Sequence, residues 1–195
     1  MTGRGRGDGG QTLGIYIVAV GALFFLAFAY FAVGQAVSAR NTAQTAADAS
    51  ALAAAREVRD SVREPFRDAL EAGDLDRIEE LLALNGMTGG NACGAAQDYA
   101  VQNGAEVNEC DVNGPSGATI ALRTSGTVGK SVVRGTETMR AHATATAVVD
   151  SRCRVDGKDG DKIMFICDGD PLTVDPTADD FDLNLAEFYF VHLSE

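Results

Sequence analysis

The sequence predicts an α+β protein organised around one long N-terminal helix. Residues 13–33 form an apolar run without charge or proline, and residues 34–55 continue it as an alanine-rich, proline-free stretch. Amphipathic segments suited to short helices follow as far as residue 104. From residue 105, short alternating segments separated by turn residues predict a small antiparallel sheet.

The apolar run has the length and composition of a transmembrane helix. A helix needs about 20 apolar residues to cross a hydrocarbon core about 30 Å thick. Because alanine is the best helix former, we expect the helix to continue outward past Gly34 without a break. The run is also longer than the apolar part of a cleaved secretory signal, so we expect it to remain in the chain.

The distribution of charge predicts the orientation of this helix. The formal net charge is −12 and the pI is about 4.5, which argues against nucleic acid as a partner. Arg4 and Arg6 precede the span and the acidic excess follows it, so we expect a cytoplasmic N-terminus. The expected regions are a cytoplasmic tail (1–11), a single-pass transmembrane helix (12–37), an extracytoplasmic helical region (38–104) and an extracytoplasmic strand-rich region (105–195).

Small residues recur along one side of the long helix at alternating steps of three and four. These positions, called the seam below, are Ala29, Ala32, Ala36, Ala39, Ala43, Ala46, Ser50 and Ala53. Small side chains let helix backbones approach closely, so the seam predicts a helix packing face. Chance regularity in so alanine-rich a stretch is the alternative.

A juxtamembrane polar motif accompanies the seam. Arg40, Gln44 and Asp48 are spaced by four and therefore share one face of the helix. Two interpretations stay open: a hydrated face above the headgroups, or a polar mark that fixes the register of neighbouring helices.

Four cysteines follow the predicted span: Cys93, Cys110, Cys153 and Cys167. On an oxidising side of a membrane they predict disulfide bonds, and four cysteines allow three pairings. We expect the neighbour pairing, 93 with 110 and 153 with 167, because it closes short loops. A zinc site is the alternative, but no C-x-x-C spacing supports it.

Several shorter elements can be placed from local patterns. Val58, Val62, Phe66 and Leu70 share one helical face, and Pro65 either kinks that helix or opens a new one. Asp74 and Asn91 are expected N-caps of two further helices, the second running to Gln102. The expected strands are 107–112, 118–124, 127–133, 142–149 and 162–167, and the strand 142–149 places three alanines on one side.

No group of residues predicts catalysis. Residues 126–131 resemble the end of a phosphate-binding loop, but the motif needs glycine where Thr124 stands. The two histidines, His142 and His192, have no recognisable nucleophile motif beside them. We therefore expect no enzyme activity and no cofactor.

A cluster of acidic turns leaves a second possibility open. Its aspartates, Asp156, Asp159, Asp161, Asp168 and Asp170, alternate with glycines, but their spacing does not match an EF-hand. Solvated surface turns are the simpler interpretation, and calcium binding is the alternative.

The span and its extension resemble the Tad (tight adherence) pilus-assembly TadE/TadG-like family of pseudopilins. The residues that carry the resemblance are 9–12, which lead into the span, and 40–55, which read Arg-Asn-Thr-Ala-Gln-Thr-Ala-Ala-Asp-Ala-Ser-Ala-Leu-Ala-Ala-Ala. Ser50 stands where the family pattern has alanine, and Ile15 stands where cleaved prepilins carry glutamate. The Ala-Val-Gly-Gln-Ala sequence that ends the span and the cysteines of the following region resemble an uncut, TadG-related protein of the actinobacterial type.

This resemblance implies a pilin-like fold and a structural function. It implies a membrane-anchored pilus-assembly or secretion component without catalytic residues. The implied partners are the membrane and pilin-like or Tad-apparatus proteins, and a homo-oligomer is a further option. The alternative is a membrane-tethered module that binds calcium or another extracytoplasmic ligand, in which the helix serves only as an anchor.

Overall fold

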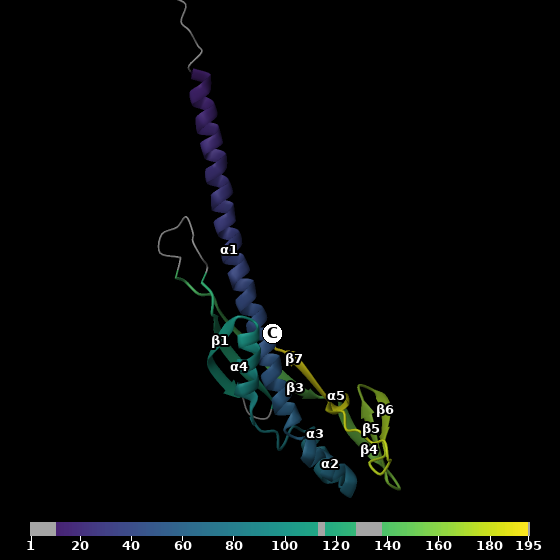
Figure 1. The fold of residues 1–195 in the computed structure, drawn as a ribbon. Coiled ribbons are helices and arrows are strands. Elements are labelled where there is room, and N and C mark those ends of the chain that lie inside the picture. The colour runs from purple at the N-terminus through teal and green to yellow at the C-terminus, as the bar shows by residue number, and fades with distance from the viewer. Residues whose placement is uncertain (1–10, 113–115, 128–137, 195) are drawn as a thin grey trace, which may run out of the picture.

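The α+β prediction is confirmed by the computed structural model, which describes residues 11–112, 116–127 and 138–194 (Figure 1). The helices are α1 (Gln11–Asp60), α2 (Arg63–Ala72), α3 (Leu75–Leu82), α4 (Ala92–Gln102) and α5 (Leu185–Phe188). The strands are β1 (Ala105–Val112), β2 (Gly117–Thr124), β3 (His142–Ser151), β4 (Cys153–Asp159), β5 (Lys162–Cys167), β6 (Asp170–Val174) and β7 (Tyr189–Leu193).

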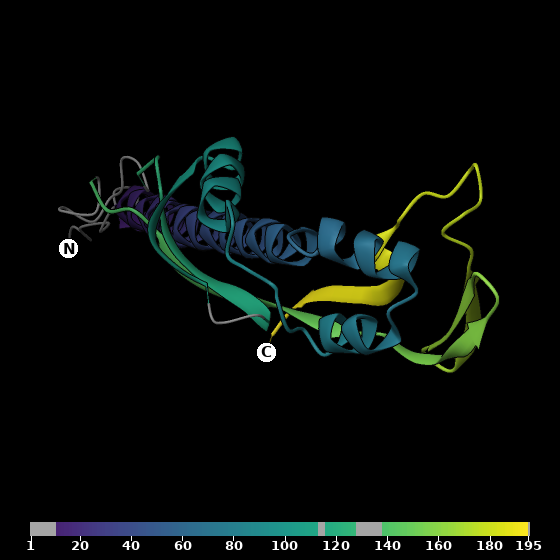
Figure 2. The same cartoon turned by 90° about the horizontal axis from the view of Figure 1, so that it is seen from below.

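Helix α1 is a single rod of two unlike halves. It runs through Gly34 without interruption, as expected from its alanine-rich, proline-free sequence. Its first half projects away from the rest of the chain, and its second half lies against α4, β3, β2 and β7 (Figures 1 and 2). We call residues 13–37 the bare segment and residues 43–194 the folded body.

The helical course after α1 follows the local signals in the sequence. A turn at Ser61 and Val62 ends α1, and Pro65 then lies in the first turn of α2. Proline is tolerated there because the first amide groups of a helix have no partner within it. Pro65 therefore opens a new helix, while Val58, Val62, Phe66 and Leu70 are all buried, as their spacing predicted.

Caps set the limits of the short helices. The carboxylate of Asp74 accepts a hydrogen bond from the Arg77 amide at 3.0 Å and so caps α3. Asn91 is the N-cap residue of α4, although its side chain makes no capping hydrogen bond. Gly73 ends α2 with a φ of 63°, and Lys158 of β4 lies over it where a larger residue would have its Cβ.

The larger sheet is antiparallel, with strand order β1-β2-β3-β7. Its alanine side faces α1: Ala145 and Ala147 of β3 are buried, whereas His142 and Thr144 on the alternate face are exposed. The period-two pattern thus correctly predicted which face of β3 packs on a helix.

The strands divide between two sheets, which corrects the expectation of one. A second antiparallel sheet, β4-β5-β6, lies at the end of the folded body far from the bare segment (Figure 2). Only Arg152 separates β3 from β4, and its amide donates to the Phe188 carbonyl while its own carbonyl accepts from Asp168. These contacts take the backbone at Arg152 out of the β3 ladder, so the chain leaves the first sheet.

Two strands of the second sheet escaped prediction. β4 contains four charged residues and Gly157, and β6 is short and contains Pro171, so neither has the usual strand composition. The predicted strand 127–133 lies outside the described residues except for Thr127, which is in no strand.

One hydrophobic core joins the expected helical and strand-rich regions. It extends from Ala43 on α1 to Tyr189 on β7. Phe66 of α2, Phe165 of β5 and Phe188 of α5 meet in it, with ring centroids 4.9 Å apart for Phe66 and Phe188 and 5.1 Å apart for Phe165 and Phe188. This aromatic cluster ties the second sheet to the helices.

Candidate assembly surface

The bare segment of α1 is the largest apolar surface in the described part of the chain. Among its large side chains, Leu13 is 67% exposed, Phe25 68% and Val33 63%. No charged residue occurs between Asp8 and Arg40. By length and composition α1 can cross a membrane, and none of its most apolar stretch is buried within the chain.

The predicted seam falls into two parts with different surroundings. Ala29 and Ala36 lie exposed on the bare segment, and Ala32 and Ala39 are half-buried. The other four positions are buried inside the chain's own folded body: Ala43, Ala46, Ser50 and Ala53. This corrects the expectation for those four, which pack on their own chain and are closed to a neighbouring helix.

The four buried positions of the seam are called the upper seam below. They are internal because they face the small alanine side chains of β3. The buried alanines of β3 leave little space between the sheet and α1, and only small residues on the helix fit there. Helix α4 meets the same part of α1 with further buried alanines, Ala92, Ala96 and Ala100. The predicted close approach is therefore present, but the partner is this chain's own sheet and helix.

The juxtamembrane motif also has two parts, because Gln44 and Asp48 lie beside β3 whereas Arg40 is exposed. The side-chain amide of Gln44 donates to Asp48 at 2.7 Å, as the spacing of four predicted. Both residues line a shallow hollow with Thr144 and Thr146 of β3. Arg40, one turn before Gln44, is exposed, and in the described part of the chain the pair within this motif is Gln44 with Asp48.

Two disulfides hold the folded body, with the expected pairing. Cys93 on α4 is bonded to Cys110 on β1, and Cys153 is bonded to Cys167 across the β4–β5 pair. All four cysteines are thus paired, which leaves no thiol for zinc. Loop closures of 17 and 14 residues in sequence separation correspond to about 3 kcal/mol each in the loop-entropy estimate.

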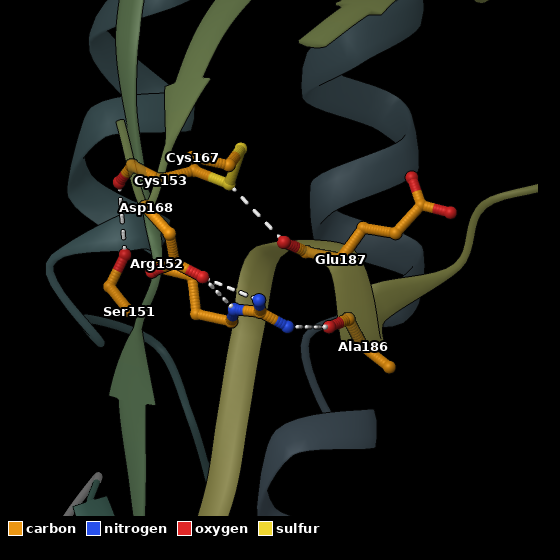
Figure 3. The surroundings of a disulfide bond; sticks show 7 residues. All are labelled: Ser151, Arg152, Cys153, Cys167, Asp168, Ala186 and Glu187. Carbon is orange, nitrogen blue, oxygen red and sulfur yellow. Dashed lines mark hydrogen bonds and ion pairs between the residues drawn. A yellow bond between two sulfur atoms is a disulfide. The ribbon is translucent and has the colours of Figure 1, made fainter. Parts of the chain in front are cut away.

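Arg152 connects the second disulfide to the rest of the body (Figure 3). Its guanidinium pairs with Asp168 and donates to the Ala186 carbonyl at 3.4 Å. The Cys153 sulfur lies 3.3 Å from the Glu187 carbonyl oxygen. Because a disulfide sulfur carries no proton, that approach is a packing contact, and the polar link between the second sheet and α5 depends on Arg152.

Within the described residues, the surroundings of Tyr189 and Asp175 shift the pKa of each side chain. Burial raises the pKa of Tyr189, whose hydroxyl donates to the Leu81 carbonyl at 3.0 Å. Hydrogen bonds from the Thr177 hydroxyl and amide lower the pKa of the exposed Asp175. The two groups stabilise a core contact and a surface turn respectively.

The acidic turns do not gather into one site. Asp159 and Asp161 lie at the turn before β5, whereas Asp168 and Asp170 lie at the turn after it. A six-residue strand separates the two turns by roughly 17–20 Å. No set of three metal-ligating side chains occurs in the described ranges, so the five aspartates do not form there the calcium loop that was the alternative interpretation.

The other chemical candidates also stay apart. His142 begins β3, and His192 on β7 pairs with Val148 six residues further along, stacked on Phe190 with centroids 5.0 Å apart. His192 Nε2 lies 3.7 Å from Asp150 Oδ2. The loop resembling a phosphate-binding motif lies mostly outside the described residues.

Comparison with known protein families finds a match for the helix that carries this surface. Residues 10–57 match the family model Tad, described as putative Flp pilus-assembly TadE/G-like. The similarity is to this segment and not to the chain as a whole. That segment coincides with nearly all of α1, Gln11–Asp60, and stops before the rest of the folded body.

The remaining comparisons define the limits of this assignment. The TadE/G-like match carries no subtype, so the actinobacterial type expected from the sequence has no support. No curated protein matches the chain, and no solved structure matches it. The elements after α1 are therefore understood from their own geometry.

Proposed function

We propose that this chain is a non-enzymatic, membrane-anchored component of a Tad-type pilus-assembly or secretion apparatus. The observation that carries the proposal is the coincidence of the TadE/G-like match with α1, a helix with one bare apolar half and one packed half. Such a helix can hold a body at a membrane and still offer its side to another helix.

In this proposal residues 12–37 cross the cell membrane. Residues 1–11 lie in the cytoplasm, and the disulfide-bonded body lies outside. Arg4 and Arg6 ahead of the span support this orientation, and so do two disulfides beyond it. Ile15, in place of the glutamate of cleaved prepilins, favours an uncut TadG-like role.

Lateral contacts to pilin-like partners or to further copies are assigned to the lower seam. Ala29, Ala32, Ala36 and Ala39 are the seam positions outside the packed half of α1. In a bilayer, small residues promote helix association because backbones approach closely and gain van der Waals contact. The folded body then supplies the contacts outside the membrane.

Cysteine crosslinking in native membranes tests this assignment. Because the four native cysteines are paired, a single introduced cysteine is the reactive thiol. We expect Ala29→Cys to crosslink to a second copy or a partner, while the control Ala27→Cys does not. The control has the same residue type at nearly the same depth, but lies about 160° around the helix at 100° per residue.

Two further variants separate the proposal from simple tethering. Ala29→Leu together with Ala36→Leu should weaken crosslinking from Ala32→Cys without changing membrane insertion. Replacement of residues 13–37 by an unrelated span should abolish pilus assembly. A chain that functions normally with the unrelated span would instead be a tethered binding module, and the assembly proposal would be rejected.

A further inference from the structure

Three exposed apolar side chains gather at the end of the folded body that adjoins the bare segment. Outside α1, the described residues include five exposed large hydrophobic side chains, namely Tyr99, Val101, Met139, Phe190 and Leu193. Val101 is 60% exposed, Met139 57% and Tyr99 42%. These three lie on elements that end or begin at one rim.

Contacts between backbone groups define that rim. The Ser125 amide after β2 donates to the Gly104 carbonyl before β1, and the Thr124 amide donates to the Ala141 carbonyl before β3. The end of α4, the start of β1, the end of β2 and the start of β3 therefore meet there, as Figure 1 shows. Tyr99 and Val101 belong to the last turn of α4, and Met139 lies three residues before His142, the first residue of β3.

The position of the rim along α1 corresponds to the membrane surface. Asn103, at the end of α4, lines a hollow with Gly34, Val37 and Ser38 of α1. Ser38 lies about 8 Å beyond Val33 on a helix that rises 1.5 Å per residue. Each polar layer of a bilayer is about 5–7 Å thick. The rim thus lies at headgroup height, at the level of Arg40, the first charged residue after the span.

The distribution of charge favours the same contact. Between Asp150 and Asp182 there are ten aspartates and four basic residues, and this acidic part includes the second sheet at the far end of the body. At the rim, Arg123 pairs with Glu106 at 3.0 Å, and Arg140 lies 4.0 Å from the same carboxylate. The acidic body therefore presents to the membrane an end whose charges are largely balanced.

We propose that this rim rests on the lipid interface, with Val101 and Tyr99 on one side and Met139 on the other inserted among the headgroups. Tyrosine and apolar side chains are favourable at this depth because one part contacts acyl chains and another stays hydrated. The proposal rests on the membrane anchoring given under Proposed function. Its consequence is that the body is held at a fixed height and tilt, in addition to its attachment through α1.

Single-tryptophan fluorescence tests this contact directly, because the chain contains no tryptophan. The full-length variants Val101→Trp and Met139→Trp are reconstituted in phosphatidylcholine and phosphatidylglycerol vesicles, with and without bromine near the top of the acyl chains. We expect bromolipid to quench both. The matched control is Phe190→Trp, which is similarly exposed at 52% but lies about 26 Å along β3 from the rim, and it should keep its emission.

Phe28→Trp within the bare segment separates failure of this inference from failure of the anchor. Quenching at position 28 with no quenching at 101 or 139, or at only one of them, overturns the rim contact and leaves the anchor intact. Quenching at position 190 also overturns it, since the body would then lie flat. Absence of quenching at position 28 rejects the anchor and the rim contact together.

Discussion

At the scale of single residues, polar atoms inside the core decide local stability. Tyr189 is 1% exposed, and its ring packs edge-on against Phe66 with centroids 6.0 Å apart. Its hydroxyl reaches the Leu81 carbonyl in α3, a residue far away in sequence. A buried tyrosine with a satisfied hydroxyl therefore links β7 to the helical layer.

The first prediction concerns this link. Tyr189→Phe keeps the ring and removes the hydrogen bond, so it should lower the free energy of unfolding by about 1 kcal/mol. The loss stays small because the Leu81 carbonyl still accepts from the Leu84 amide. Denaturant unfolding of the full chain in detergent measures it. Tyr99→Phe, at an exposed position, is the control and should leave the midpoint unchanged.

The second prediction concerns Ser50, which departs from the alanine of the family pattern. Its side chain is fully buried, and its hydroxyl has no hydrogen-bond partner among the described residues. Ser50→Ala should therefore stabilise the folded body by about 1 kcal/mol, since it removes an unsatisfied buried group. The same unfolding measurement applies, with the exposed Ser38→Ala as control. A destabilised S50A variant would contradict the description of the Ser50 hydroxyl as an unsatisfied buried group.

At the scale of elements, α1 performs two tasks with one sequence pattern. Its lower half is compatible with lipid because it lacks charge, and its upper half fits a sheet because it lacks bulk. Periodicity predicted the small-residue face along both halves. It did not predict that β3 and α4 of the same chain occupy the upper half, because the packing partner of a helix face depends on contacts distant in sequence.

The third prediction tests that internal packing. Ala46→Leu adds volume where the side chain is fully buried against the body, so it should destabilise the body by about 1–3 kcal/mol. Ala36→Leu, on the exposed lower seam, should leave body stability unchanged. Protection of the body against limited proteolysis, measured in detergent, distinguishes the two. Equal protection in A46L and the parent chain would place the upper seam outside the core.

At the scale of the whole molecule, the two ends of the structure differ in chemical character. The bare apolar segment lies at one end and the acidic second sheet at the other, with the core between them (Figures 1 and 2). This arrangement suits a body held at a membrane surface with its acidic end directed away from anionic headgroups.

The fourth prediction tests the orientation across the membrane. Because the native cysteines are paired, Thr2→Cys and Ser194→Cys each introduce one free thiol at opposite ends of the chain. In spheroplasts, a membrane-impermeant maleimide should label position 194 at once and position 2 only after permeabilisation. The reverse order of labelling would exclude the proposed cytoplasmic N-terminus.

Local chemistry in the sequence determined much of this protein. The apolar run, the proline-free alanine stretch, the Asp74 cap and the alternation in β3 each identify an element, because each depends on neighbours within a few residues. Spacing predicted the Gln44–Asp48 pair, and among the three possible cysteine pairings it favoured the observed one, since those partners are close along the chain.

Only the tertiary structure decided how these elements are used. It divided the strands between two sheets, covered the upper seam with β3 and α4, separated the acidic turns by the length of β5, and brought Val101 and Met139 to one rim. Each of these outcomes depends on pairs of residues far apart in sequence. Their association is set by the complementary volume and burial of whole faces, which no local pattern contains.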